Sequence, residues 1–452
     1  MPRRAPNHQL AVLLDQARWR ATDLARAVNA LGAAQGVALR YDRTAVAHWL
    51  AGSRPRAPVP ELVAQALSGR TARLVTAEDT GLAPLTPDST PPPLMPWDGG
   101  EPVRHLLTLC GADADPARRA FLQRTVYTLA AVPTLSWPLT PPPRRHSPRP
   151  SEAADAATLE AMARTFAALA QQHGGAPIRT ALAAYLTDHA GRLIAAPASP
   201  TVHRQLAAGI AQLTYLLADM TADAGHPGLA QRYFHTALGL AHQAANHRLY
   251  GITLRAMSTQ ALRLGHPQHA LHLADAAVDI ACPVKDPATS AFLCAQRALT
   301  HARTRQPRAA LADLAAAERH AEAAHSPPGP FTSYPRAALD YQRAQTLHVL
   351  GEHAQALAAL QAAADHRDPV AQRRPYALTH ARLAETLLGI GHLEAACTHW
   401  QTFLDHYPSL HSTLVEQALT RLQQNLARFP RQRLATEVAA RAGTIARPSH
   451  TV

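Results

Sequence analysis

The sequence predicts an all-α protein: an N-terminal helix-turn-helix domain followed by a C-terminal α-solenoid of helix pairs. Two observations carry this prediction. A short helix within residues 42–56 has the polar start and the glycine stop that suit the second helix of a helix-turn-helix. In the C-terminal part, a Gly–x–x–x–x–Ala motif returns every 39 to 46 residues, which is typical of stacked helical repeats.

The segment 42–56 is expected to form a recognition helix. Asp42 can accept a hydrogen bond from the free backbone N–H groups of the first turn, while Gly52 and Pro55 end the helix. Three residues at i, i+3 and i+4 form its inward, apolar face: Val46, Trp49 and Leu50. The opposite face is therefore free to meet a partner.

Because the N-terminal end of a recognition helix meets base edges in the major groove, its outward residues are candidate DNA readers. Those candidates are Arg43, Thr44, Ala45 and His48. Three flanking residues are placed to hold the phosphate backbone: Arg40, Arg54 and Arg56.

Further helices are expected over residues 10–17, over 22–29 with Thr22 as N-cap, and over 58–67. With the recognition helix they resemble the lambda-repressor-like helix-turn-helix of the XRE family. The resemblance rests on Val46, Trp49 and Gly52, which match the run that closes the family's recognition helix. It implies sequence-specific DNA binding, with Arg43, Thr44, Ala45 and His48 at the base-reading positions.

One departure from that family is the long connection at residues 32–41, where about 3–4 residues are usual. Val37 and Leu39 alternate with other residues, which suits a small wing-like excursion. The docking geometry on DNA is therefore left open. So is the alternative that this Arg-bearing helical domain contacts proteins.

The chain has 452 residues and a formal net charge of +12, which suits an anionic partner. Residues 1–85 carry 11 Arg and 6 acidic residues, so the first domain is the most basic per residue. Lys285 is the only lysine, a bias typical of GC-rich genomes such as those of actinobacteria.

Several classes of function are disfavoured. The four cysteines form no CxxC pair and the histidines show no metal-ligand spacing, so neither a disulfide framework nor a metal site is expected. No phosphate-binding loop, GxSxG or HExxH motif is present, which argues against an enzyme and predicts no cofactor. No apolar run approaches the ~18 residues of a membrane span, and a cytoplasmic location is expected.

Three regions are predicted along the chain. Residues 1–85 form the DNA-binding domain. Residues 86–150 form a Pro-rich linker with a helical segment inside it, roughly 103–109 and 116–131. Residues 151–445 form the solenoid.

The solenoid repeat is anchored at Gly225, Gly265, Arg305, Gly351, Gly391 and Pro430, each followed five residues later by alanine. A weaker copy begins at Gly175. The pattern of a turn glycine, a small residue and a bulky residue along the second helix resembles the tetratricopeptide repeat. Small residues at the same position of each repeat let two antiparallel helices approach closely. The resemblance to stacked repeats further implies a superhelix with a concave groove.

The resemblance also implies a set of groove residues that would contact a peptide, a small ligand or a protein: Gln212, Tyr215, Asp219, Arg255, Tyr341, Gln345, His348 and Glu385. The alternative is that they form ordinary solvated helix faces of a dimerisation scaffold.

Together, the two domains resemble actinobacterial regulators and, more loosely, the peptide-sensing regulators of Gram-positive bacteria. The sequence therefore predicts a transcriptional regulator that binds double-stranded DNA as a homodimer and senses a groove ligand. A repressor is favoured because no acidic activation surface is evident. The alternative is a tetratricopeptide scaffold whose DNA-binding head is non-specific or vestigial.

Overall fold

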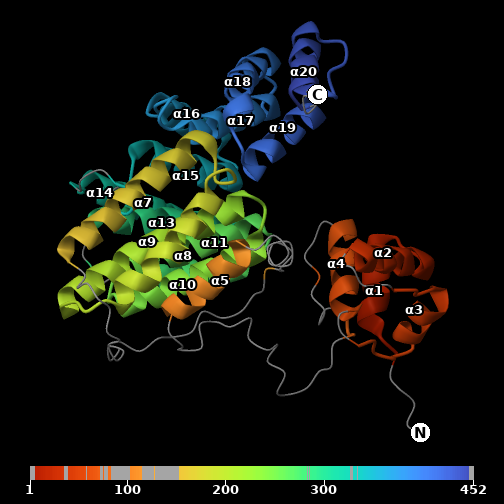
Figure 1. Ribbon diagram of the computed structural model, residues 1–452. Coiled ribbons are helices and arrows are strands. Elements are labelled where there is room, and N and C mark those ends of the chain that lie inside the picture. The colour runs from red at the N-terminus through yellow and green to blue at the C-terminus, as the bar shows by residue number, and fades with distance from the viewer. Residues whose placement is uncertain are drawn as a thin grey trace, which may run out of the picture. The chain divides into compact units, whose positions relative to one another are not determined.

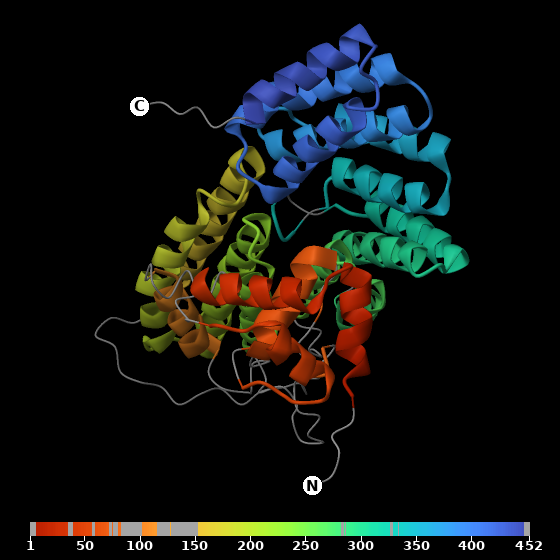
Figure 2. The same ribbon diagram turned by 90° about the vertical axis from the view of Figure 1, so that its right-hand side faces the viewer.

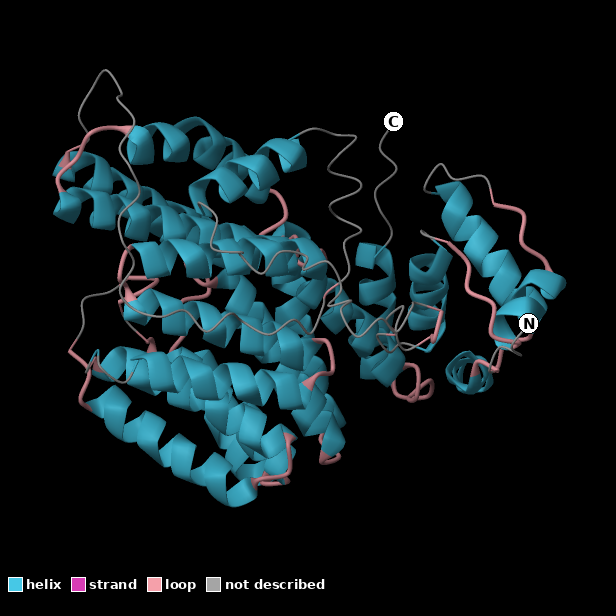
Figure 3. Cartoon of the chain, turned by 90° about the horizontal axis from the view of Figure 1, so that it is seen from below, coloured by secondary structure: helices cyan, strands magenta, loops and turns pink. Residues whose placement is uncertain are grey.

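The computed structural model describes residues 6–34, 39–56, 59–71, 75, 80–82, 102–114, 127, 152–281, 284, 286–325, 329–332 and 334–446. All of its regular elements are helices, and no strand occurs in this part of the chain (Figure 3). The all-α prediction is thus confirmed. The chain divides into two compact units, Met1–Leu94 and Met95–Val452. The predicted helical stretch 116–131 lies, except for Tyr127, outside the described residues, as do linker residues 86–101 and 138–150.

The first unit contains four helices: α1 (His8–Ala17), α2 (Ala21–Ala34), α3 (Arg43–Leu50) and α4 (Val59–Thr71). Their apolar faces meet in one core in which Leu10, Leu24, Val46 and Leu62 are almost fully buried. The predicted N-cap of α2 is wrong, because the helix already begins at Ala21 and Thr22 lies in its first turn.

The second unit begins with α5 (Pro102–Ala114), α7 (Ala153–His173) and α8 (Arg179–Ala195). Six helix pairs and a short 3-10 helix, Tyr407–Ser409, complete it (Figure 1). The pairs are α9 (Pro200–Asp223) with α10 (Pro227–Gln243), α11 (His247–Arg263) with α12 (Pro267–Ala281), α13 (Pro287–Arg303) with α14 (Pro307–Glu322), α15 (Arg336–Leu350) with α16 (His353–Asp365), α17 (Arg373–Gly389) with α18 (Leu393–His406), and α19 (Thr413–Leu426) with α20 (Arg433–Ala446).

Each pair packs against the next, which confirms the solenoid. The helix predicted at 103–109 is α5, and it packs against α8 and α10 at the start of the array. None of the described helices has both the length and the apolar character needed to cross a membrane.

The repeat motif marks the turn inside each pair. The four glycines have φ between 85° and 91°, a left-handed conformation that other residues rarely adopt. The alanine five residues after each anchor has no exposed surface at all six positions: Ala230, Ala270, Ala310, Ala356, Ala396 and Ala435. The motif therefore combines a sharp turn with a close approach of two helices.

Arg305 occupies the glycine position of the α13–α14 turn with a φ of 62°. Replacing it by glycine is expected to raise the free energy of unfolding by about 0.5–1 kcal/mol. Glycine removes the strain of the left-handed backbone in the folded state, which stabilises the protein. It also gives the unfolded chain more conformational freedom, which offsets part of that gain. Urea unfolding measures the change. The same substitution at exposed, helical Arg303 should destabilise instead, so equal losses for both variants would contradict the prediction.

Helices α7 and α9, early in the array, contact α17 and the start of α19, near its other end. The backbone N–H of His411, just before α19, donates to the carbonyl of His173 at the end of α7, at 2.8 Å. Beside it, the buried carboxylate of Asp223 accepts hydrogen bonds from Arg374 and from Ser412, and from the backbone N–H of Gly175 at 3.0 Å. In Figure 2, α7 (yellow) reaches the C-terminal helices (blue) at this point. We call these contacts the closure.

Candidate nucleic-acid interface and solenoid inner face

Helix α3 begins and ends where the sequence predicts. The Asp42 carboxylate accepts a hydrogen bond from the Ala45 backbone N–H at 2.9 Å, and this bond holds the pKa of Asp42 below its ordinary value. At the other end, Gly52 has a φ of 98°, and Ser53 N–H donates to the His48 carbonyl at 2.9 Å. Local capping therefore defines this helix on both sides.

The two faces of α3 differ as predicted. Val46 and Trp49 are buried in the core of the first unit, whereas Arg43, Thr44 and His48 are exposed. Ala45 is half-buried and packs against the core, so it offers less surface than predicted.

The residue that the sequence reasoning missed on the outward face is Ala47, which is exposed one helical turn after Arg43. Its i+4 spacing from Arg43 was the available signal. A small methyl group at this position leaves room for close approach of a partner.

Four exposed arginines lie on α3 or beside it in the chain: Arg40, Arg43, Arg54 and Arg56. None of them forms an ion pair with any residue that the structure describes. Asp42 is the one acidic residue in the described segment 39–56, and its carboxylate is engaged at the helix N-terminus. The surface therefore presents cationic groups whose counter-charges must come from solvent or from an anionic partner.

The end of the long α2–α3 connection is anchored to α2. The Asn29 side chain donates to the Tyr41 carbonyl at 2.8 Å and accepts from the Tyr41 N–H at 2.9 Å. The Tyr41 ring then meets the Trp49 ring edge-to-face at 5.1 Å. Residues 35–38, including Val37 of the expected wing, lie outside the described residues. Asn29 and Tyr41 thus position the start of α3.

Asn7 positions the other end of α3. Its side chain caps α1 by accepting from the Leu10 N–H at 3.0 Å and donates to the Thr80 carbonyl at 2.8 Å. Its backbone N–H donates to the carbonyl of Leu50, the last residue of α3, at 2.8 Å. One residue therefore ties three segments of the first unit together.

In the second unit, the predicted groove residues lie on the first helices of four pairs, α9, α11, α15 and α17, and are half-buried: Gln212, Tyr215, Asp219, Arg255, Tyr341, Gln345, His348 and Glu385. We call the side of α9 and α11 that carries Tyr215, Asp219 and Arg255 the inner face. Desolvation raises the pKa of Asp219, although the nearby guanidinium groups of Arg374 and Arg263 oppose this.

Tyr215 and Glu385 are among the predicted groove residues that the chain itself already engages. The Tyr215 ring meets the Phe331 ring edge-to-face at 5.2 Å, and Phe331 comes from the segment between α14 and α15. The Glu385 carboxylate forms ion pairs with Arg382 at 3.0 Å and Arg421 at 2.7 Å. A ligand would meet these groups only by displacing their present partners.

The sequence reasoning missed Phe331 and three further residues of this region: Arg263, Phe292 and Tyr334. The Arg255 guanidinium lies 3.6 Å from the centre of the Phe292 ring, and Tyr334 meets the same ring edge-to-face at 4.8 Å. A small pocket opens beside them, lined by Ile252, Thr289, Phe292 and Phe331 among others. Arg263 follows Arg255 by eight residues on α11, and this spacing was the available signal.

Comparison with known proteins bears on the first unit. Residues 10–83 match the family model of the SP15 N-terminal domain, a span that runs from α1 to just beyond Leu82. No curated protein is significantly similar in sequence to the chain.

Proposed function

We propose that the protein is a sequence-specific DNA-binding transcriptional regulator. Its first unit inserts α3 into the major groove, where Arg43, Thr44 and His48 meet base edges. Arg40, Arg54 and Arg56 neutralise phosphates on either side. One observation carries the proposal. The outward face of the capped helix α3 is exposed, and the four exposed arginines on it or beside it have no ion-pair partner among the described residues.

The proposal extends to the tetratricopeptide-like solenoid, which would join two chains and sense a ligand on its inner face. A dimer would carry two first units, the DNA-binding heads, and these would bind two half-sites about one helical turn of DNA apart. A ligand that binds one arrangement of the heads better than another would change DNA affinity through a coupling free energy. Repression is favoured over activation, because the sequence has no evident acidic activation surface.

The test is selection of bound fragments from sheared genomic DNA by the full-length protein at about 0.15 M salt, followed by sequencing. The proposal expects a few short, partly palindromic sites to be enriched. Uniform recovery of all fragments would contradict it and would favour the alternative, a scaffold with a non-specific head.

Replacing Arg54 by glutamine is expected to weaken binding to all DNA sequences alike. Loss of one phosphate contact should reduce the slope of log K against log salt concentration by about one. Titrations at several salt concentrations measure the slope. Arg308→Gln is a matched control, because Arg308 is an exposed arginine without an ion-pair partner on α14. An unchanged slope for Arg54→Gln would place this arginine away from the DNA.

A further inference from the structure

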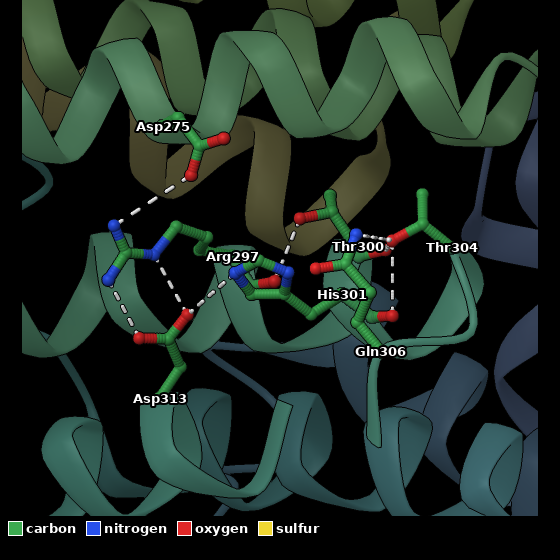
Figure 4. Close-up of polar contacts among 7 residues, drawn as sticks. All are labelled: Asp275, Arg297, Thr300, His301, Thr304, Gln306 and Asp313. Carbon is green, nitrogen blue, oxygen red and sulfur yellow. Dashed lines mark hydrogen bonds and ion pairs between the residues drawn. The ribbon is translucent and has the colours of Figure 1, made fainter. Parts of the chain in front are cut away.

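Arginines in the solenoid fall into two groups according to their partners. Arg297 on α13 represents the paired group (Figure 4). It donates two hydrogen bonds of 2.8 Å to Asp313 and lies 3.8 Å from Asp275. The half-buried guanidinium of Arg297 thus has its acceptors built into the fold.

Arg255 on α11 represents the second group. Its Nε is buried and has no hydrogen-bond acceptor. Stacking on Phe292 holds the plane of the guanidinium but supplies no acceptor for its N–H groups. Arg263 lies two turns further along the helix and also has no ion pair with any described residue. Among the described residues, Arg255 and Arg263 therefore have no ion-pair partner.

The surroundings of these arginines are desolvated. The pKa of Arg255 and of Arg263 is lowered chiefly by desolvation, even though the Arg263 side chain retains exposed surface. Arg263 opens to solvent, whereas Arg255 is half-buried. Asp219 acts electrostatically on both arginines, but it forms an ion pair with neither.

We propose that Arg255 and Arg263 bind the oxyanion, a carboxylate or phosphate group, of a small ligand that enters the inner face. Arg255 supplies a planar set of donors held by Phe292, which suits an oxyanion. The backbone positions of the two arginines are about 12 Å apart along the helix axis at 1.5 Å per residue, so both reach one ligand only through their long side chains. Phe331 already covers the neighbouring Tyr215, which favours a small molecule over an extended chain as the ligand.

This inference deepens the sensing role proposed above and rests on it, but it does not depend on DNA binding. The test therefore measures anion binding by the full-length protein directly. Thermal unfolding is followed with increasing inorganic phosphate in one arm and sodium benzoate in the other. Sodium chloride keeps the ionic strength constant, because salt alone shifts stability. A ligand that binds the folded state raises the unfolding temperature in a saturable way.

The wild-type protein is expected to show a saturable rise with at least one probe. Saturation by phosphate alone identifies a phosphorylated ligand, and saturation by benzoate alone identifies an organic acid. Arg255→Gln should raise the concentration needed for half of the effect at least tenfold, and Arg308→Gln should leave it unchanged. No saturable rise in the wild type, or the same curve for Arg255→Gln, would overturn the proposal.

Two further variants keep the test decisive. Arg263→Gln alters an exposed side chain, so it is expected to fold even where Arg255→Gln does not, and it should weaken the same response. Arg255→Lys retains the charge but loses the planar donors, and it should bind the probe less well than wild type. Genomic DNA selection with Arg255→Gln reports on the head separately, so failure of the anion site and failure of the regulator proposal are distinguishable.

Discussion

The double variant Arg43→Ala/His48→Ala is expected to lose about 2–6 kcal/mol of binding free energy for the preferred DNA site. Each base-reading side chain contributes about 1–3 kcal/mol, and the two contributions add if they contact separate bases. Both side chains are exposed, and Val46 and Trp49 fill the core without them, so the fold should be retained. Fluorescence anisotropy with the selected duplex and with a scrambled duplex measures the loss.

The comparison with scrambled DNA separates base-specific binding from non-specific electrostatic binding to the phosphate backbone. His48→Ala alone should leave scrambled DNA bound nearly as before, since specificity resides in base contacts. Arg26→Ala is a matched control in the same unit, because Arg26 is an exposed arginine on α2 with one long contact of 3.8 Å to Asp23. If the double variant binds the preferred site as tightly as Arg26→Ala does, α3 is not the recognition helix.

Replacing Asp113 by alanine is expected to lower the free energy of unfolding of the second unit by about 3–5 kcal/mol. Asp113 on α5 accepts hydrogen bonds from Arg179 on α8 and, at 3.2 Å, from Tyr233 on α10. All three side chains are almost completely buried. The variant leaves a buried guanidinium without its counter-charge, and this is the costly step. Urea unfolding followed by far-ultraviolet circular dichroism measures it.

Two controls test whether the uncompensated charge of Arg179 causes the loss of stability. The double variant Asp113→Ala/Arg179→Met removes both charges and should recover part of the lost stability. Glu437→Ala removes one partner of the exposed Arg433–Glu437 pair and should change the free energy of unfolding far less than Asp113→Ala does. If Asp113→Ala is as mild as Glu437→Ala, the buried pair does not hold α5 to the solenoid.

The repeat and the recognition helix could be predicted from the sequence because their causes are local. The closest packing between two helices demands a residue as small as Ala230 or Ala270, and a left-handed turn favours a residue such as Gly225. These demands return every 39 to 46 residues and are visible in the sequence itself. The ends of α3 are likewise determined within a few residues, by Asp42 and Gly52.

The remaining features depend on contacts between distant residues that no periodic pattern marks. Phe331 lies between two repeats and outside their phase, yet it packs on Tyr215. The Asn29–Tyr41 pair bridges the long connection through side-chain and backbone groups together. The partners of Glu385 and the missing hydrogen-bond acceptor of Arg255 Nε also became visible only in three dimensions.

The closure has a consequence for how this protein can change in evolution. Open arrays gain or lose repeats easily, since each unit contacts only its neighbours. Here His411 must reach His173, and Arg374 must reach Asp223. Inserting or deleting one helix pair between them would move these partners apart and leave Asp223 buried without its counter-charge. We therefore expect related chains that keep these residues to keep the same number of pairs, and variation in length to fall in the linker.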